Sequence, residues 1–183
     1  KPKGLVLETA NADVTRAELS LWQQILDLLI DPNVIFLMVS IGLIGPGLVG
    51  GALLDQIASQ VERLRRDFKI DLRVRGVAGS RVMRLVQGSV DLARWREEYA
   101  AGEGPVDLER FADHVHADQF PHAVIIDCSA NADVANRYAH WLSEGIHIVT
   151  PNKKANSASY EYYERMRESR RAAGSHYLYE ATV

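Results

Sequence analysis

Three glycines spaced as G-x-G-x-x-G constrain this chain more than any other feature. They are Gly45, Gly47 and Gly50, and they lie between an apolar run and an amphipathic segment. In a strand–turn–helix unit, the first glycine permits the tight turn, the second lets a pyrophosphate approach the backbone, and the third lets the helix pack on the strand. Unpaired N–H groups at the start of the helix would then hold the anion. Residues 41–54 therefore predict a dinucleotide-binding turn.

The residues on either side of the glycines support this interpretation. Residues 34–39 form a β-favouring run that is typical of a strand buried on both faces. After the glycines, apolar residues recur at spacings of three and four, as on a helix that covers a sheet. These are Val49, Leu53, Ile57, Val61, Leu64 and Phe68. A purely structural strand–turn–helix is the alternative, because the glycine pattern alone is weak evidence.

Composition restricts the class of protein. The chain has 183 residues and a net charge of −3, which gives no electrostatic case for a nucleic-acid or anionic-membrane partner. Its longest apolar run, residues 34–44, is shorter than the roughly 20 residues needed to cross a bilayer. Cys128 is the single cysteine, which excludes an internal disulfide framework and fits a reducing compartment. We therefore expect a soluble intracellular protein that binds a small molecule.

Strands and helices alternate along the rest of the chain. Further strands are expected over residues 71–78, 123–128, 146–150 and 176–180. Helices are expected over residues 92–99, capped by Asp91, over residues 108–115, capped by Asp107, between Asn131 or Asp133 and Gly145, and over residues 157–173. This alternation implies right-handed crossovers, and it predicts an α/β fold with a doubly wound, mostly parallel sheet of the Rossmann type.

Residues 1–38 are the least informative part of the chain. Thr15 and Glu18 have the spacing of a capping box, and the apolar residues that follow them indicate a helix that ends near residues 31–33. We interpret this segment as a linker or as the remnant of an upstream domain, with a simple packing helix as the alternative.

The end of the second predicted strand bears on the choice of cofactor. An NAD-preferring domain usually places Asp or Glu there to hold the ribose 2′-hydroxyl. This chain instead has Ala78, Gly79, Ser80 and Arg81, and Asp71 lies at the opposite end of the strand. Because Arg81 suits a 2′-phosphate, NADP(H) is favoured over NAD(H). A solvated surface arginine is the alternative.

Two more loops are expected beyond the carboxyl ends of the strands, where such sheets bind ligands. Ser129, after the third parallel strand, is expected near the nicotinamide ribose. Lys153, after the next strand, is expected near the reacting end of the cofactor, where its cation can attract a carboxylate or polarise a carbonyl. Lysines in loops are more often solvated than catalytic, and Cys128 is expected to pack rather than react.

Three histidines invite a metal-site interpretation. They are His114, His116 and His122. Because no cysteine or carboxylate falls at a recognised metal spacing from them, we expect surface histidines instead.

Five segments carry a resemblance to a known family. They are IGLIGPGLVGGALLDQ, FKIDLRVRGVAGSR, DCSANADVANRYAHWL, GIHIVTPNKKANS and HYLYEATV. They resemble homoserine dehydrogenase, above all the plant-type bifunctional aspartokinase–homoserine dehydrogenase. The resemblance covers residues 41–183, and PNKKAN and YEATV separate it from a generic Rossmann domain. It implies reversible, NADPH-dependent reduction of L-aspartate 4-semialdehyde to L-homoserine, on the route to threonine, methionine and isoleucine.

The resemblance also implies roles for individual residues. Lys153, in the PNKK motif, would lie near both cofactor and substrate and act in catalysis. A monovalent cation (sodium) would bind at Glu180 and Val183. By motif, the cofactor would contact Gly45, Gly47, Leu48, Val49, Gly50, Ala78, Ser129 and Lys153.

The resemblance implies, finally, a piece of a longer plastid polypeptide that forms a homo-oligomer. Residues 39–183 would be the NAD(P)-binding domain, truncated before the substrate and dimerisation domain. We expect this piece to fold, to bind NADPH weakly and not to turn over substrate alone. A non-catalytic dinucleotide-binding or sensory module, and a Rossmann reductase with another substrate, are the alternatives.

Overall fold

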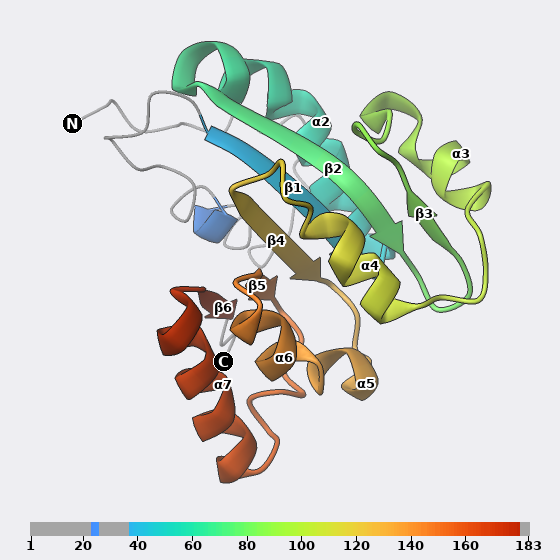
Figure 1. Ribbon diagram of the computed structural model, residues 1–183. Helices are drawn as coiled ribbons and strands as arrows, with labels where there is room; N and C mark the ends of the chain where they lie inside the picture. Colours follow the sequence, from blue (N-terminus) through green and yellow to red (C-terminus); the bar gives the residue numbers. More distant parts are fainter. Residues whose placement is uncertain (1–22, 26–36, 180–183) are drawn as a thin grey trace.

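The structure, a computed structural model, describes residues 23–25 and 37–179, and its centre is a six-stranded sheet of order β3-β2-β1-β4-β5-β6 (Figure 1). All neighbouring strands are parallel except β3, which is antiparallel to β2. The strands are β1 (Leu37–Ile44), β2 (Ile70–Ala78), β3 (Met83–Leu85), β4 (His122–Asp127), β5 (His147–Thr150) and β6 (Tyr177–Tyr179). The helices are α2 (Leu48–Phe68), the 3₁₀ turn η1 (Leu92–Arg94), α3 (Trp95–Ala100), α4 (Leu108–Val115), α5 (Ala132–Ala135), α6 (Tyr138–Ser143) and α7 (Tyr160–Ala173).

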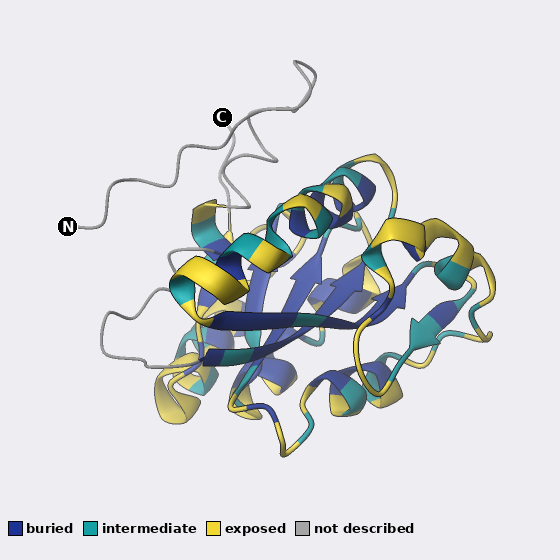
Figure 2. Ribbon diagram, turned by 90° about the horizontal axis from the view of Figure 1, so that it is seen from above, coloured by how far each residue is buried: buried dark blue, intermediate teal, exposed yellow. Residues whose placement is uncertain are grey.

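Two hydrophobic cores lie on the two faces of the sheet. Because side chains alternate along a strand, Val124 and Ile126 of β4 join the core under α2, whereas Ala123 and Ile125 join the core under α4, α6 and α7. Figure 2 shows the buried sheet between two layers of helices whose outer surfaces are exposed. The predicted α/β, doubly wound and mostly parallel architecture is confirmed. No helix within the described residues is long and apolar enough to span a membrane.

The described part of the first strand overlaps the predicted residues 34–39 at residues 37–39 and continues beyond them. β1 runs to Ile44 through Ser40 and Gly42, and residues 34–36 lie outside the described ranges. Only glycine fits at position 42, because a Cβ there would lie 2.5 Å from Val115 and 2.7 Å from the Phe111 ring. A residue that weakens a strand pattern in the sequence therefore makes room for α4.

Other elements differ from the prediction in detail. β3 was not predicted, since its three residues are ordered by pairing with the end of β2 rather than by a local pattern. The helix predicted over residues 92–99 opens as η1, and the single helix predicted before Gly145 is divided into α5 and α6. The N-cap positions are confirmed, because the side chains of Asp91, Asp107 and Asn131 all accept backbone N–H groups.

Several predictions fall where the structure gives no description. Of residues 1–38, only 23–25, which are helical, and 37–38 are described, so the capping box of Thr15 and Glu18 lies outside the described residues. Glu180 and Val183 lie outside them as well.

The three histidines predicted to lie on the surface differ in exposure. His116 is exposed, whereas His114 is half-buried with its Nε2 2.8 Å from the carbonyl oxygen of Val86, which corrects the expectation of surface histidines. Among the described residues no group of three or more His, Cys, Asp or Glu could hold a metal ion.

A different row of histidines lies at the amino ends of three adjacent strands. The His147 ring is 6.0 Å from that of His122 and 5.2 Å from that of His176, between centroids. His147 Nδ1 accepts the backbone N–H of His176 at 3.0 Å. Burial, together with the neighbouring His176 and His122, lowers the pKa of His147 to about 4.

Acid is expected to destabilise the fold through His147. Its unfolded pKa is about 6.5, so the unfolded chain takes up the proton first and stability falls as pH decreases from 6.5 towards 4. After allowance for solvent screening, we expect a loss on the order of 1 kcal/mol between pH 6.5 and 5. Urea unfolding of His147→Gln should show a shallower pH dependence than the parent, with His116→Gln as the exposed control. Equal pH slopes in parent and His147→Gln would contradict this account.

Candidate dinucleotide-binding site

The turn after β1 can be made only by glycine. Gly45 has a φ of +83°, a left-handed value that other residues rarely adopt. Its N–H donates to the carbonyl of Ala78 at 2.8 Å, which joins the turn to the end of β2. A Cβ on Gly45 would lie 2.7 Å from the backbone nitrogen of Ser129. The ends of β1, β2 and β4 therefore meet at this residue.

Helix α2 begins at this turn with open backbone amides. Gly47 is its N-cap, no side chain caps it, and its first turn has no acidic residue. The first N–H groups of a helix have no partner within the helix and lie at the positive end of its dipole. Gly47 is exposed, and a Cβ there would meet nothing within 4 Å. This arrangement fits a pyrophosphate group, as the glycine spacing predicts.

The other three predicted contacts of the turn differ in exposure. Gly50 is buried, and a Cβ on it would lie 2.3 Å from the carbonyl oxygen of Gly45, so α2 packs directly on the turn. Leu48 is 86% exposed and Val49 is half-buried. Backbone amides, rather than these two side chains, would form the contacts to an anion.

A cavity of about 370 Å³ opens beside the turn, beyond the carboxyl ends of β1, β2 and β4. It is lined by Ile44, Gly45, Pro46, Gly47, Gly79, Ser80, Tyr99, Ser129, Asn131 and Val134. A second hollow of about 760 Å³ shares five of these residues and continues toward residues 105–108 and 133–137. This is the edge of the sheet where doubly wound folds bind their ligands.

The end of β2 carries the residues predicted to decide cofactor choice. Ala78 is fully buried, and Gly79 and Ser80 line the cavity. Arg81 follows them, exposed and outside the cavity lining, and it forms no ion pair within the part of the chain that the structure describes. Asp71 lies at the opposite end of β2, with one carboxylate oxygen 2.8 Å from Arg73. None of the described residues that line the 370 Å³ cavity is acidic. Asp107 lines the adjoining hollow, where its side chain caps α4.

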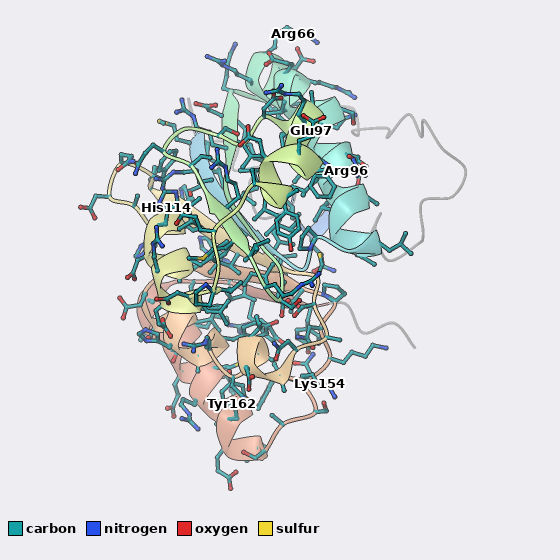
Figure 3. The ribbon with its side chains drawn as sticks, turned by 90° about the vertical axis from the view of Figure 1, so that its right-hand side faces the viewer. Arg66, Arg96, Glu97, His114, Lys154 and Tyr162 are labelled. Atoms are coloured by element: carbon teal, nitrogen blue, oxygen red, sulfur yellow. The ribbon has the colours of Figure 1, made fainter. Side chains whose placement is uncertain are left out.

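The loops after β4 and β5 are brought next to one another. Ser129 lines the cavity, and its N–H donates to Asp127 Oδ1 at 2.8 Å. Cys128 is half-buried and packs against the core under α2, as predicted. Lys153 is exposed and is not part of the cavity lining. Figure 3 shows its neighbour Lys154 on the same loop.

Tyr99 is a cavity residue that the sequence does not reveal. Its hydroxyl lies so close to Gly79 that a Cβ there would be 1.9 Å away. Tyr99 belongs to α3, which is held against α2 by Asp55. That carboxylate accepts Trp95 Nε1 at 2.8 Å and the Arg96 guanidinium at 2.9 and 2.7 Å. Figure 3 labels Arg96 on α3, next to α2. The hydrogen bonds from Arg96 hold the pKa of Asp55 below its usual value.

Comparison with known proteins decides the family. Residues 45–180 match the family described as "Homoserine dehydrogenase, NAD binding domain". This chain belongs to the homoserine dehydrogenase family. It contains that family's NAD-binding domain, so its cofactor is a nicotinamide dinucleotide.

The relatives include bifunctional plant and bacterial enzymes. The chain is 48% identical over 145 residues to the chloroplastic bifunctional aspartokinase/homoserine dehydrogenase 1 of Arabidopsis thaliana, covering 79% of this chain and 16% of the relative. It is 34% identical over 146 residues to the bifunctional enzyme of Haemophilus influenzae, covering 80% and 18%. The chain therefore spans about a sixth of the length of these curated relatives.

Solved structures share the fold. A hyperthermophilic archaeal homoserine dehydrogenase in complex with NADPH aligns with a TM-score of 0.63 at 23% identity, covering 80% of this chain and 45% of that one. A homoserine dehydrogenase from Thermoplasma acidophilum aligns with a TM-score of 0.56 at 20% identity, covering 79% and 43%. The Rossmann-type architecture is therefore that of the family.

Proposed function

We propose that this chain is the NADP(H)-binding part of an enzyme that reduces L-aspartate 4-semialdehyde to L-homoserine. The proposal depends on the glycine turn of this family member. The uncapped amides at the start of α2 adjoin a cavity, and no acidic residue lines that cavity at the end of β2. The chloroplastic names of the plant relatives favour a plastid location. The pathway served would lead to threonine, methionine and isoleucine.

The proposed cofactor contacts follow the sheet order. The pyrophosphate lies on the backbone of Gly45, Gly47, Leu48, Val49 and Gly50. The adenosine lies on the β2 side, beside Ala78, with its 2′-phosphate on Arg81. The nicotinamide half lies on the β4 side, beside Ser129 and Lys153. NAD(H) would use the same contacts without the one to Arg81.

Lys153 is the proposed catalytic residue. Its ammonium would stabilise the negative charge that develops on the aldehyde oxygen during reduction. A bound NADPH would supply the hydride for this reduction. A monovalent cation, sodium, is proposed at Glu180 and Val183. We propose that residues 39–183 form the cofactor domain of a longer, homo-oligomeric polypeptide in which residues 1–38 are a linker or domain remnant.

Titration of NADPH and NADH into the chain and two variants tests the cofactor assignment. Gly47→Ala places a methyl group where the pyrophosphate approaches, so we expect both cofactors to bind at least about tenfold more weakly with unchanged stability, because nothing lies within 4 Å of that Cβ. Arg81→Ala removes only the partner of the 2′-phosphate, so NADPH alone should bind about tenfold more weakly. Calorimetry measures both constants.

The two variants test the pyrophosphate site and the 2′-phosphate site separately. Arg94→Ala, at an exposed arginine on η1, is the control for loss of a positive charge. Unchanged affinity in Gly47→Ala would place the pyrophosphate elsewhere. An unchanged preference for NADPH in Arg81→Ala would remove Arg81 from the site and leave the glycine turn in it.

A further inference from the structure

Asp127 is a fully buried carboxylate at the carboxyl end of β4. Its Oδ1 accepts the N–H of Ser129 at 2.8 Å. Its Oδ2 accepts the hydroxyl of Tyr138 at 2.5 Å and the side-chain amide of Asn152 at 2.9 Å.

Such a group is costly to bury, so the contacts that it makes are informative. A carboxylate removed from water is tolerated when hydrogen bonds satisfy its oxygens. The Ser129 N–H and the Asn152 amide can only donate, and burial raises the pKa of Tyr138, so that its phenol stays protonated and donates too. Every partner is therefore a donor, which is the arrangement that an ionised carboxylate requires.

The same residue connects the two loops beyond β4 and β5. Thr150 Oγ1 donates to the carbonyl of Asp127 at 2.7 Å and accepts the N–H of Asn152 at 2.8 Å. Asn152 also donates to the carbonyl of Asn131 at 3.0 Å, and its Oδ1 accepts the N–H of Lys154 at 3.1 Å. The PNKK loop and the cavity-lining residues Ser129 and Asn131 are thus held in one network around the buried Asp127, Thr150 and Asn152.

The position of this network relative to the glycine turn decides which half of a bound dinucleotide would lie beside it. β1 lies at the centre of the strand order, with β2 on one side and β4 and β5 on the other. A dinucleotide whose pyrophosphate lies on the turn after β1 extends one half toward each side. The half toward β2 meets Gly79 and Ser80, whereas the half toward β4 meets the loops that Asp127 holds.

We propose that Asp127 is a positioning residue for the nicotinamide half of the cofactor. Asp127 does not touch the ligand. It orients the Ser129 amide through Oδ1 and the PNKK loop through Oδ2. The adenosine half depends on other elements, namely the glycine turn and the end of β2. This assignment rests on the proposed NADP(H) function.

Two ligands distinguish positioning from a general structural role. NADPH contains both halves, whereas 2′,5′-ADP contains only the adenosine end with its 2′-phosphate. In Asp127→Asn, one of the two acceptor oxygens is replaced by an NH₂ donor. We therefore expect NADPH to bind about tenfold more weakly. The affinity for 2′,5′-ADP should change by less than about twofold. Calorimetry on the 183-residue chain measures both constants, and Asp113→Asn, at an exposed position on α4, is the control.

A milder variant keeps the test decisive if Asp127→Asn does not fold. Tyr138→Phe removes one donor to Oδ2 and leaves Ser129 and Asn152 in place. It should weaken NADPH binding in the same selective way, by about threefold. The amide proton of Ser129, observed by NMR without ligand, should also move upfield in Asp127→Asn as its hydrogen bond to a carboxylate is lost.

Each outcome decides between the two proposals. Selective loss of NADPH affinity supports positioning by Asp127. Equal loss of both ligands, or an unchanged ratio of the two affinities in the folded variants, overturns it while leaving the proposed function in place. Failure of the parent chain to bind NADPH at all overturns the proposed function itself.

Discussion

Gly50→Val is expected to lower the free energy of unfolding by more than about 3 kcal/mol and to abolish NADPH binding. A Cβ at this position would lie 2.3 Å from the carbonyl oxygen of Gly45 and 3.1 Å from the Leu43 side chain. The backbone oxygen cannot move away without disturbing the Gly45 N–H bond to Ala78. Helix α2 must therefore shift away from the turn, which displaces the amides proposed to hold the pyrophosphate. Urea unfolding and calorimetric titration measure the two losses.

Gly51→Ala is the matched control, one residue further along the same helix. A Cβ there meets the Trp95 ring at 3.3 Å, a contact that a side chain can accommodate, and alanine favours helix over glycine by about 1 kcal/mol. Stability and affinity should both stay close to those of the parent. A Gly50→Val protein with parental stability would show that α2 does not depend on close contact with the turn.

Phe111→Ala is expected to cost about 3–5 kcal/mol of stability, because this fully buried ring fills the space between α4 and the sheet. The ring occupies the space above two strand glycines, since a Cβ would lie 2.7 Å from it at both Gly42 and Gly76. Gly76→Ala alone should cost about 1–3 kcal/mol through overpacking. In the Phe111→Ala background the clash disappears, so the same methyl group should be nearly neutral.

The double-mutant cycle measures this coupling directly. We expect a favourable interaction energy of about 1–2 kcal/mol between the two substitutions in urea unfolding. Gly88→Ala, whose Cβ would meet nothing within 4 Å, provides a control that should be additive with Phe111→Ala. Additive effects of Gly76→Ala and Phe111→Ala would mean that the ring does not determine the need for glycine on β2.

Local patterns in the sequence predicted much of the fold. The glycine turn, the stripe along α2 and the caps at Asp91, Asp107 and Asn131 depend on neighbours within a few residues, and the structure contains all of them. Gly174, with a φ of +67°, ends α7 as its place in the sequence indicates. These features are encoded by spacing and residue type, which a single sequence displays.

Contacts between distant segments could not be predicted in this way. Tyr99 reaches Gly79 only because α3 is fastened to Asp55, more than forty positions away from Tyr99 in the chain. The link from Asp127 to Asn152 likewise crosses twenty-five positions. Neither pair has a periodic pattern that connects it. The roles of Lys153 and Arg81 remain predictions, since both side chains lie outside the cavity lining.

The attachment of α3 to Asp55 on α2 has an evolutionary consequence. One wall of the cavity beside the glycine turn comes from a segment outside the strand–turn–helix unit, and a single acidic side chain on α2 anchors it. Mutations in that segment can therefore reshape the rim around the end of β2 while the proposed phosphate-binding turn stays intact. Drift there offers the lineage a route to altered discrimination between the two nicotinamide coenzymes without loss of the fold.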